Sequence, residues 1–119
     1  MAYRDLEVYK RAYQLALEIH KLSFILKIRD LSDQIRRASR SIPSNIAEAY
    51  GRDKSVNDIV NGLRTALGSN DEMLFNIEFM KDTELITQNQ YQKLYDEYTI
   101  CGKQLHKLIE AVKNQQTRN

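Results

Sequence analysis

The sequence contains few of the residues that break a chain into short segments. Its 119 residues include one proline, four glycines and no tryptophan. The short strands of an all-β domain need a turn signal about every 8 to 12 residues, so this scarcity favours helices. Hydrophobic residues make up 42% and charged residues 29% of the chain, a balance that excludes a disordered or collagen-like protein. We therefore expect one globular domain over residues 1–119.

Cysteine is almost absent as well. Cys101 is the single cysteine, so the chain cannot form an internal disulfide and lacks the signature of a small secreted scaffold. Charged residues recur every few positions in the first ten residues, which fits neither a secretory signal nor a membrane span. We therefore expect a cytoplasmic protein with no membrane partner.

The chain also lacks a strong net charge. Its 18 lysines and arginines and 16 acidic residues give a net charge of +2. The electrostatic field of the whole molecule is therefore too weak to imply a polyanionic partner. The positive charge is local instead. Seven basic and four acidic residues between positions 27 and 54 give that segment a charge of +3.

Apolar residues recur at helical spacing in four segments, at about 5–26, 31–52, 55–81 and from 87 onwards. Two segments begin with the spacing of a capping box, Ser55 with Asp58 and Thr87 with Gln90. Long helices joined by connections of a few residues pack as antiparallel neighbours. The sequence therefore predicts an all-α fold, an antiparallel up-down four-helix bundle, with a polar tail from about residue 114.

A proline, Pro43, lies inside the second helical segment. Proline removes one backbone donor there, and its ring crowds the carbonyl group of Ser39, at a cost of about 3 kcal/mol. The apolar stripe keeps its phase on both sides of the proline, because Ile42 and Ile46 continue it. We therefore expect a kink near residues 39–43 rather than a chain reversal.

The third segment has two apolar faces. Its spacing predicts an inner face made of Val56, Ile59, Leu63, Ala66, Leu67, Asn70, Leu74 and Ile77. Phe75 and Phe79 lie one turn apart on nearly the opposite side, near Gly68. The first segment also has more apolar surface than one core can bury. A second copy can cover such surface at about 25 cal/mol per Å². We expect a homo-oligomer with Phe75, Phe79, Tyr9 and Tyr13 at its interface.

No catalytic or metal-binding constellation is apparent. Neither His20 nor His106 has a glutamate three residues before it, as a di-metal helical bundle requires. Neither follows an arginine at the spacing of an all-helical ribonuclease motif. We expect each to be a partly buried or boundary residue with local hydrogen bonds. Cys101 lies on the inner face of the fourth segment without a second thiol, and the scattered glycines form no phosphate-binding loop. We expect a non-enzymatic protein without cofactor or metal.

Two asparagines, Asn45 and Asn70, lie at or near the predicted inner faces. A buried amide without a partner costs on the order of 1–3 kcal/mol, which leaves two interpretations. In the first, they bond to each other, to Glu48 or across an interface, and so fix the register of the helices. In the second, both lie at the boundary of the core and bond to water.

The densest positive cluster is in the second segment, where Arg36, Arg37 and Arg40 project away from the apolar stripe. One helix would then present three guanidinium groups, with Arg52 and Lys54 near its end. Such a surface can bind the phosphates of RNA. The alternative is a solvated face, or ion pairs with acidic residues of another subunit.

The segment from Leu31 to Arg52, LSDQIRRASRSIPSNIAEAYGR, resembles the signature of the bacterial four-helix-bundle proteins named after 23S ribosomal RNA intervening sequences. The opening from Tyr3 to Tyr9, and Arg64 to Ser69 followed by Glu72, resemble further motifs of that family. Two departures are visible. Ala49 replaces a usual glycine, and residues 23–31 lack the usual aromatic, proline and glycine turn.

The resemblance implies a four-helix bundle that assembles as a ring-shaped homopentamer. It also implies kinship with the accessory proteins of diversity-generating retroelements, which bind reverse transcriptase and nucleic acid. It assigns no catalysis to the family-like residues, which are Arg36, Arg37, Ser41, Pro43, Asn45, Glu48 and Arg52. We therefore expect an oligomeric scaffold that binds RNA or a nucleic-acid-associated protein. A protein–protein interaction module with no nucleic-acid role is the alternative.

Overall fold

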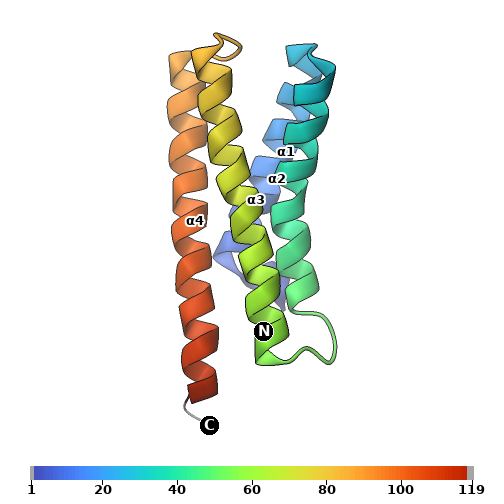
Figure 1. Ribbon diagram of the computed structural model, residues 1–119, viewed down its shortest axis with the longest axis vertical. Helices are drawn as coiled ribbons and strands as arrows, with labels where there is room; N and C mark the ends of the chain where they lie inside the picture. The colour runs from blue at the N-terminus through green and yellow to red at the C-terminus, as the bar shows by residue number, and fades with distance from the viewer. Residues whose placement is uncertain (1, 118–119) are drawn as a thin grey trace.

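The computed structural model describes residues 2–117 and, of their side chains, those up to residue 115. A short 3₁₀ turn, η1 (Tyr3–Asp5), precedes four helices, α1 (Glu7–Leu26), α2 (Arg29–Ala49), α3 (Val56–Asp82) and α4 (Gln88–Thr117). No strand occurs in the described range. The helices alternate in direction along a molecule of 51 × 22 × 20 Å (Figure 1). The predicted all-α four-helix bundle is confirmed.

Each helix packs against the helices that neighbour it in sequence, and α1 also contacts α4. The α1–α2 and α3–α4 connections lie at one end of the bundle, drawn at the top in Figure 1. The α2–α3 loop, the start of α1 and the end of α4 lie at the other end. The predicted polar tail from about residue 114 continues α4 to Thr117. No helix of the described chain is long and apolar enough to span a membrane.

The helix starts follow the capping pattern in the sequence. The Asp58 backbone N–H donates to Ser55 Oγ, and the Ser55 N–H donates to Asp58 Oδ2, each at 3.1 Å. Thr87 and Gln90 exchange the equivalent pair of hydrogen bonds at 2.8 and 3.1 Å. Both predicted capping boxes are thus present, and they satisfy backbone donors that the first turn of a helix leaves free.

The core stripe of α2 is as predicted. Ile35, Ala38, Ile42, Ile46 and Ala49 are buried and Leu31 is half-buried. Helix α2 continues through Pro43, which is itself buried, so the chain does not reverse there. The kink near residues 39–43 stays a prediction.

The inner face of α3 follows the prediction in part, because Leu63, Ala66, Asn70 and Ile77 are buried as expected. Val60, Met73, Asn76 and Met80 are buried, whereas the predicted core residues Val56, Ile59, Leu67 and Leu74 are only half-buried. Helices α2 and α3 approach closely at Gly62, where an added Cβ would lie 2.7 Å from the Cβ of Ala49. The buried stripe of α3 runs through positions 63, 66, 70, 73, 77 and 80, at alternating steps of three and four residues.

Candidate functional site

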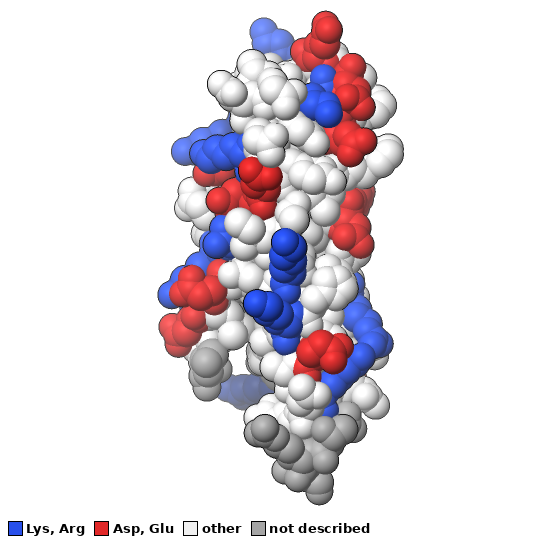
Figure 2. Space-filling model, turned by 90° about the vertical axis from the view of Figure 1, so that its left-hand side faces the viewer, with Lys and Arg blue, Asp and Glu red and all other residues white. Residues whose placement is uncertain are grey.

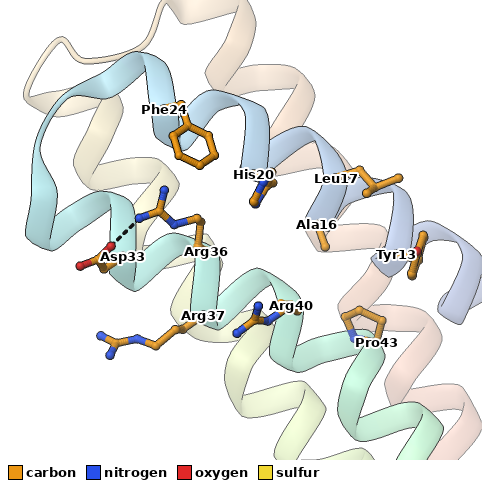
Figure 3. A pocket seen from close by; sticks show the side chains of 10 residues that line it. All are labelled: Tyr13, Ala16, Leu17, His20, Phe24, Asp33, Arg36, Arg37, Arg40 and Pro43. Atoms are coloured by element: carbon orange, nitrogen blue, oxygen red, sulfur yellow. Dashed lines mark hydrogen bonds and ion pairs between the residues drawn. The ribbon is translucent and has the colours of Figure 1, made fainter.

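A groove runs along the outside of the bundle between α1 and α2, with a volume of about 580 Å³. We call it the α1–α2 groove. Figure 3 shows the side chains that line it, which are Tyr13, Ala16, Leu17, His20 and Phe24 from α1 and Asp33, Arg36, Arg37, Arg40 and Pro43 from α2. Helix α1 supplies an apolar and aromatic wall, and α2 supplies a mainly cationic wall.

Arg36 is held in place within this groove. It forms an ion pair with Asp33 and donates from Nη1 to Ser23 Oγ at 3.2 Å. Its guanidinium carbon lies 4.8 Å from the centre of the Phe24 ring, a cation–π distance. Arg36 is consequently half-buried. The helix presents two free guanidinium groups there rather than the three expected from the spacing.

Arg37 and Arg40 are the two free cations. Both side chains are exposed, and no ion pair joins either of them to another residue in the described part of the chain. In Figure 3 the Arg37 side chain points away from α1, whereas Arg36 points towards Phe24. Arg37 also borders a smaller polar hollow between α2 and α3, beside Ser41, Ser69 and Glu72. Both guanidinium groups are therefore available to an anionic ligand.

The other two predicted nucleic-acid residues lie elsewhere. Arg52 and Lys54 are exposed in the loop between α2 and α3, at the opposite end of the bundle. The nine residues from Arg40 to the end of α2 alone span about 14 Å. The structure therefore brings Arg36, Arg37 and Arg40 together and separates Arg52 and Lys54 from them.

A second unusual surface lies on α3, where two phenylalanine rings project from the outer side of the helix. Phe75 and Phe79 are 68% and 49% exposed, and their rings stack with centroids 6.4 Å apart. Asp71, Glu72 and Glu78 are exposed beside them. We call these five residues the α3 ridge. The sequence predicted that the two rings are exposed. The three acidic residues beside them were not predicted, although their helical spacing from Phe75 and Phe79 places them on the same side of α3.

The predicted interface tyrosines occupy different settings. Tyr9 is half-buried between Tyr3 and Tyr13, at centroid distances of 5.0 and 5.9 Å, and burial raises its pKa above the ordinary value. Tyr13 is 50% exposed and lines the α1–α2 groove. The four predicted interface residues thus lie on α1 and on α3, which are at opposite corners of the bundle.

The face formed mainly by α4 carries both signs of charge. Figure 2 shows acidic and basic side chains interspersed over it. Some of them pair across helices, because Arg11 of α1 binds Glu97 of α4 and Lys93 lies 3.9 Å from Glu18. No single-sign surface comparable to the α1–α2 groove or the α3 ridge is seen on that face.

The residues considered for catalysis are not gathered in one place. His20 and His106 are both exposed, so the expectation of partial burial is wrong for both. The His20 ring contacts Phe24 edge-on, with centroids 5.0 Å apart. Cys101 is buried, and burial raises the pKa of its thiol to about 12. Among the described residues no group of three or more His, Cys, Asp or Glu side chains could hold a metal ion.

Asn70 is fully buried, and its Nδ2 donates to the backbone carbonyl of Tyr98 in α4 at 2.9 Å. Its Oδ1 has no hydrogen-bond partner in the described structure. Asn70 therefore bonds neither to Asn45 nor to Glu48, and the boundary interpretation is wrong for it. Its single bond ties α3 to α4.

Comparison with known proteins accounts for this fold. The family model described as 23S rRNA-intervening sequence protein matches residues 4–107. The chain belongs to this family. A crystal structure of a protein of unknown function from Bacteroides thetaiotaomicron VPI-5482, assigned to the S23 ribosomal protein family, is similar, with a TM-score of 0.82 and 30% sequence identity. The match covers 92% of this chain and 99% of that one. No curated protein matches.

Two of the residues that resemble the motifs of the 23S rRNA-intervening sequence family, Ser41 and Ser69, join α2 to α3. Asn45 Nδ2 donates to the Ser41 carbonyl at 2.7 Å and to Ser41 Oγ at 2.8 Å. Ser69 Oγ donates to Ser41 Oγ at 2.9 Å across the two helices. Asn45 thus bonds within its own helix, and Glu48 is exposed. Among these residues, the bond between Ser41 and Ser69 is the one that links α2 to α3.

Proposed function

We propose that this chain is a non-enzymatic scaffold protein that self-associates in the cytoplasm. The observation that carries the proposal is the distribution of exposed apolar side chains. Of the eight large hydrophobic residues that are exposed in the described part of the chain, seven lie on α1, on the connection after it, or on α3. They are Tyr13, Leu17, Phe24, Ile25, Ile28, Phe75 and Phe79. Apolar patches of this kind are typical of protein interfaces.

The energy available from these side chains is sufficient for association. A phenylalanine side chain buries about 200 Å², so covering the exposed parts of Phe75 and Phe79 removes roughly 230 Å² from water. At about 25 cal/mol per Å² this contributes about 6 kcal/mol. Association costs about 4–15 kcal/mol in lost freedom. Burial of the two rings alone therefore offsets an association cost at the lower end of that range. Burial of the exposed apolar residues of α1 adds further favourable free energy. The family resemblance implies five copies.

A second candidate function is RNA binding through Arg37 and Arg40. The specific observation is that both guanidinium groups are exposed and form no ion pair among the described residues, and that both residues line a groove whose α1 wall is aromatic. Arginine binds phosphate with a planar pair of donors, and aromatic rings stack on unpaired bases. Repetition of the surface in an oligomer would raise the avidity for one RNA strand by orders of magnitude.

Sedimentation velocity over a series of concentrations tests the scaffold. The expected result is a mass that is a multiple of the 13.9 kDa protomer. The variant F75S/F79S should sediment as a monomer with an unchanged circular dichroism spectrum. Ile100→Ser is the matched control, because Ile100 is an exposed apolar residue on α4. A wild-type monomer throughout the micromolar range would overturn the proposal.

Filter binding against a structured RNA, with a salt titration, tests the second candidate. The variant R37A/R40A should bind RNA more weakly, and its affinity should depend less on salt concentration. R52A/K54A should bind RNA as the wild type does. Weak binding that is indifferent to salt would exclude an RNA role. Capture of a partner protein that survives R37A/R40A would support an interaction module with no nucleic-acid function.

A further inference from the structure

We propose that the α1–α2 groove of one copy takes the α3 ridge of a second copy, so that copies join head to tail. This inference rests on the self-association proposed above and adds which surface meets which. Its basis is that the two surfaces are complementary in charge and in apolar character. The groove presents the free guanidinium groups of Arg37 and Arg40, and the ridge presents three carboxylates beside two phenylalanine rings.

The charges on both surfaces form no ion pair within the described protomer, although Arg37 and Glu72 line the same hollow between α2 and α3. No ion pair joins Asp71, Glu72 or Glu78 to another residue of the described chain, and the same holds for Arg37 and Arg40. Exposed charges of opposite sign on one molecule attract when copies meet, and they orient the encounter. Arginine and aromatic side chains are also enriched at the centres of protein interfaces. The groove therefore matches the ridge better than it matches a neutral apolar surface.

The two surfaces lie at the same height on the bundle. Helix α2 starts and α3 ends at the same end of the molecule, at the top in Figure 1. Arg37 and Arg40 lie eight and eleven residues from the start of α2, which is about 12 and 16 Å. The ridge, from Asp71 to Phe79, spans about 5–16 Å from the end of α3. A copy can therefore dock beside its neighbour without sliding along the helix axis.

The groove is long enough for both rings. From Tyr13 to Phe24 its α1 wall spans eleven residues, or about 16 Å, whereas Phe75 and Phe79 are one helical turn apart. Leu17 and Phe24 are 44% and 63% exposed in this wall and offer apolar contact. Arg40, on the other wall, can lie against the face of a phenylalanine ring that enters.

A symmetric pairing of ridge with ridge is less favourable, because it brings six carboxylates together against one neighbouring arginine per copy, Arg37 beside Glu72. Pairing of groove with groove likewise brings cations together. A head-to-tail contact leaves each chain with one free groove and one free ridge, and repetition then produces a closed ring or an open filament. Since the surfaces share one height, rotation about an axis along the bundle produces a ring.

Two variants that each block one surface provide the test. R37E/R40E reverses the charge of the groove and leaves the ridge intact. F75E/F79E removes the rings and leaves the groove intact. All four side chains are exposed to solvent, and circular dichroism checks that each variant folds. Each variant alone should sediment as a monomer. Their mixture should form a one-to-one heterodimer of twice the protomer mass that grows no further, because only one productive contact remains.

A charge exchange within one chain gives a second measurement. The variant R37E/R40E/E72R/E78R reverses both surfaces, so it should recover the wild-type mass that R37E/R40E loses. A control that reverses two positive charges away from both surfaces, such as K103E/K107E on α4, should leave the mass unchanged.

The outcomes separate this inference from the proposal on which it rests. A wild-type protein that is monomeric at every concentration overturns both. A wild-type oligomer whose mass survives R37E/R40E or F75E/F79E overturns the pairing alone. Two monomeric variants that form no heterodimer overturn the head-to-tail geometry. If R37E/R40E keeps the wild-type mass and loses RNA binding, the groove holds RNA instead of a second copy.

Discussion

The hydroxyl group of Tyr98 leads to a prediction that is opposite in sign to the usual effect of a core substitution. Tyr98 is fully buried in α4, and its hydroxyl has no hydrogen-bond partner in the described structure. Burial also raises the pKa of Tyr98 above the ordinary value. A buried polar group without a partner costs about 1–3 kcal/mol. Tyr98→Phe removes that cost and should therefore stabilise the protein.

The magnitude follows from the size of the group removed. Losing one oxygen leaves a void of about 10–15 Å³, roughly one water probe. At about 24 cal/mol per Å³ this void costs about 0.3 kcal/mol, so the net gain is about 1–2.5 kcal/mol. Unfolding entropy of about 2.1 cal/mol/K per residue converts 1 kcal/mol into about 4 °C for 119 residues. The expected rise in Tm is about 4–10 °C.

Thermal and urea unfolding, followed by circular dichroism at two protein concentrations, measure this effect separately from subunit dissociation. Tyr95→Phe is the matched control, because Tyr95 is half-buried on the same helix and should change Tm by less than about 2 °C. A Tyr98→Phe protein that is less stable than the wild type would refute the reasoning. It would show that the hydroxyl has a partner, such as a bound water.

Four further predictions follow from local contacts. Gly62→Ala should destabilise the fold by about 1–3 kcal/mol, because the new methyl meets the Cβ of Ala49. Gly68→Ala, with nothing within 4 Å, should stabilise it by up to about 1 kcal/mol in urea unfolding. Cys101 should resist a thiol reagent at pH 8 in the native protein and react after unfolding, because burial raises its pKa to about 12. Hydrogen bonds from Ser55 lower the pKa of Asp58, so its stabilisation is present above the unfolded pKa and disappears as pH falls through the folded pKa. The urea midpoint of the wild type should accordingly fall more than that of Asp58→Asn on acidification.

The elements of the bundle were predictable because local signals agreed. The stripe of α2 repeats at helical spacing without a competing apolar face, so its buried residues follow directly from the sequence. The capping pairs of α3 and α4 are also local, since each pair lies within one helical turn. The exposure of Phe75 and Phe79 could be predicted because both residues lie on the side of the helix opposite the predicted inner face of α3.

The inner face of α3 could be predicted only in part. Leu63, Ala66 and Ile77 are buried as expected, but Asn76 is buried although it carries no hydrophobic signal, and the strongly apolar Leu67 and Leu74 are only half-buried. The contact of Gly62 with Ala49 depends on a second helix, so it cannot be read from α3 alone. The contacts of Arg36 could not be predicted from α2 alone either, because its partners Ser23 and Phe24 belong to α1.

Both chain ends emerge from the end of the bundle that is remote from the α1–α2 groove and the α3 ridge (Figure 1). In a ring whose axis runs along the bundle, every terminus would therefore lie on the same rim. Cargo fused to either terminus would be concentrated on that rim, and the opposite rim would stay open to solvent.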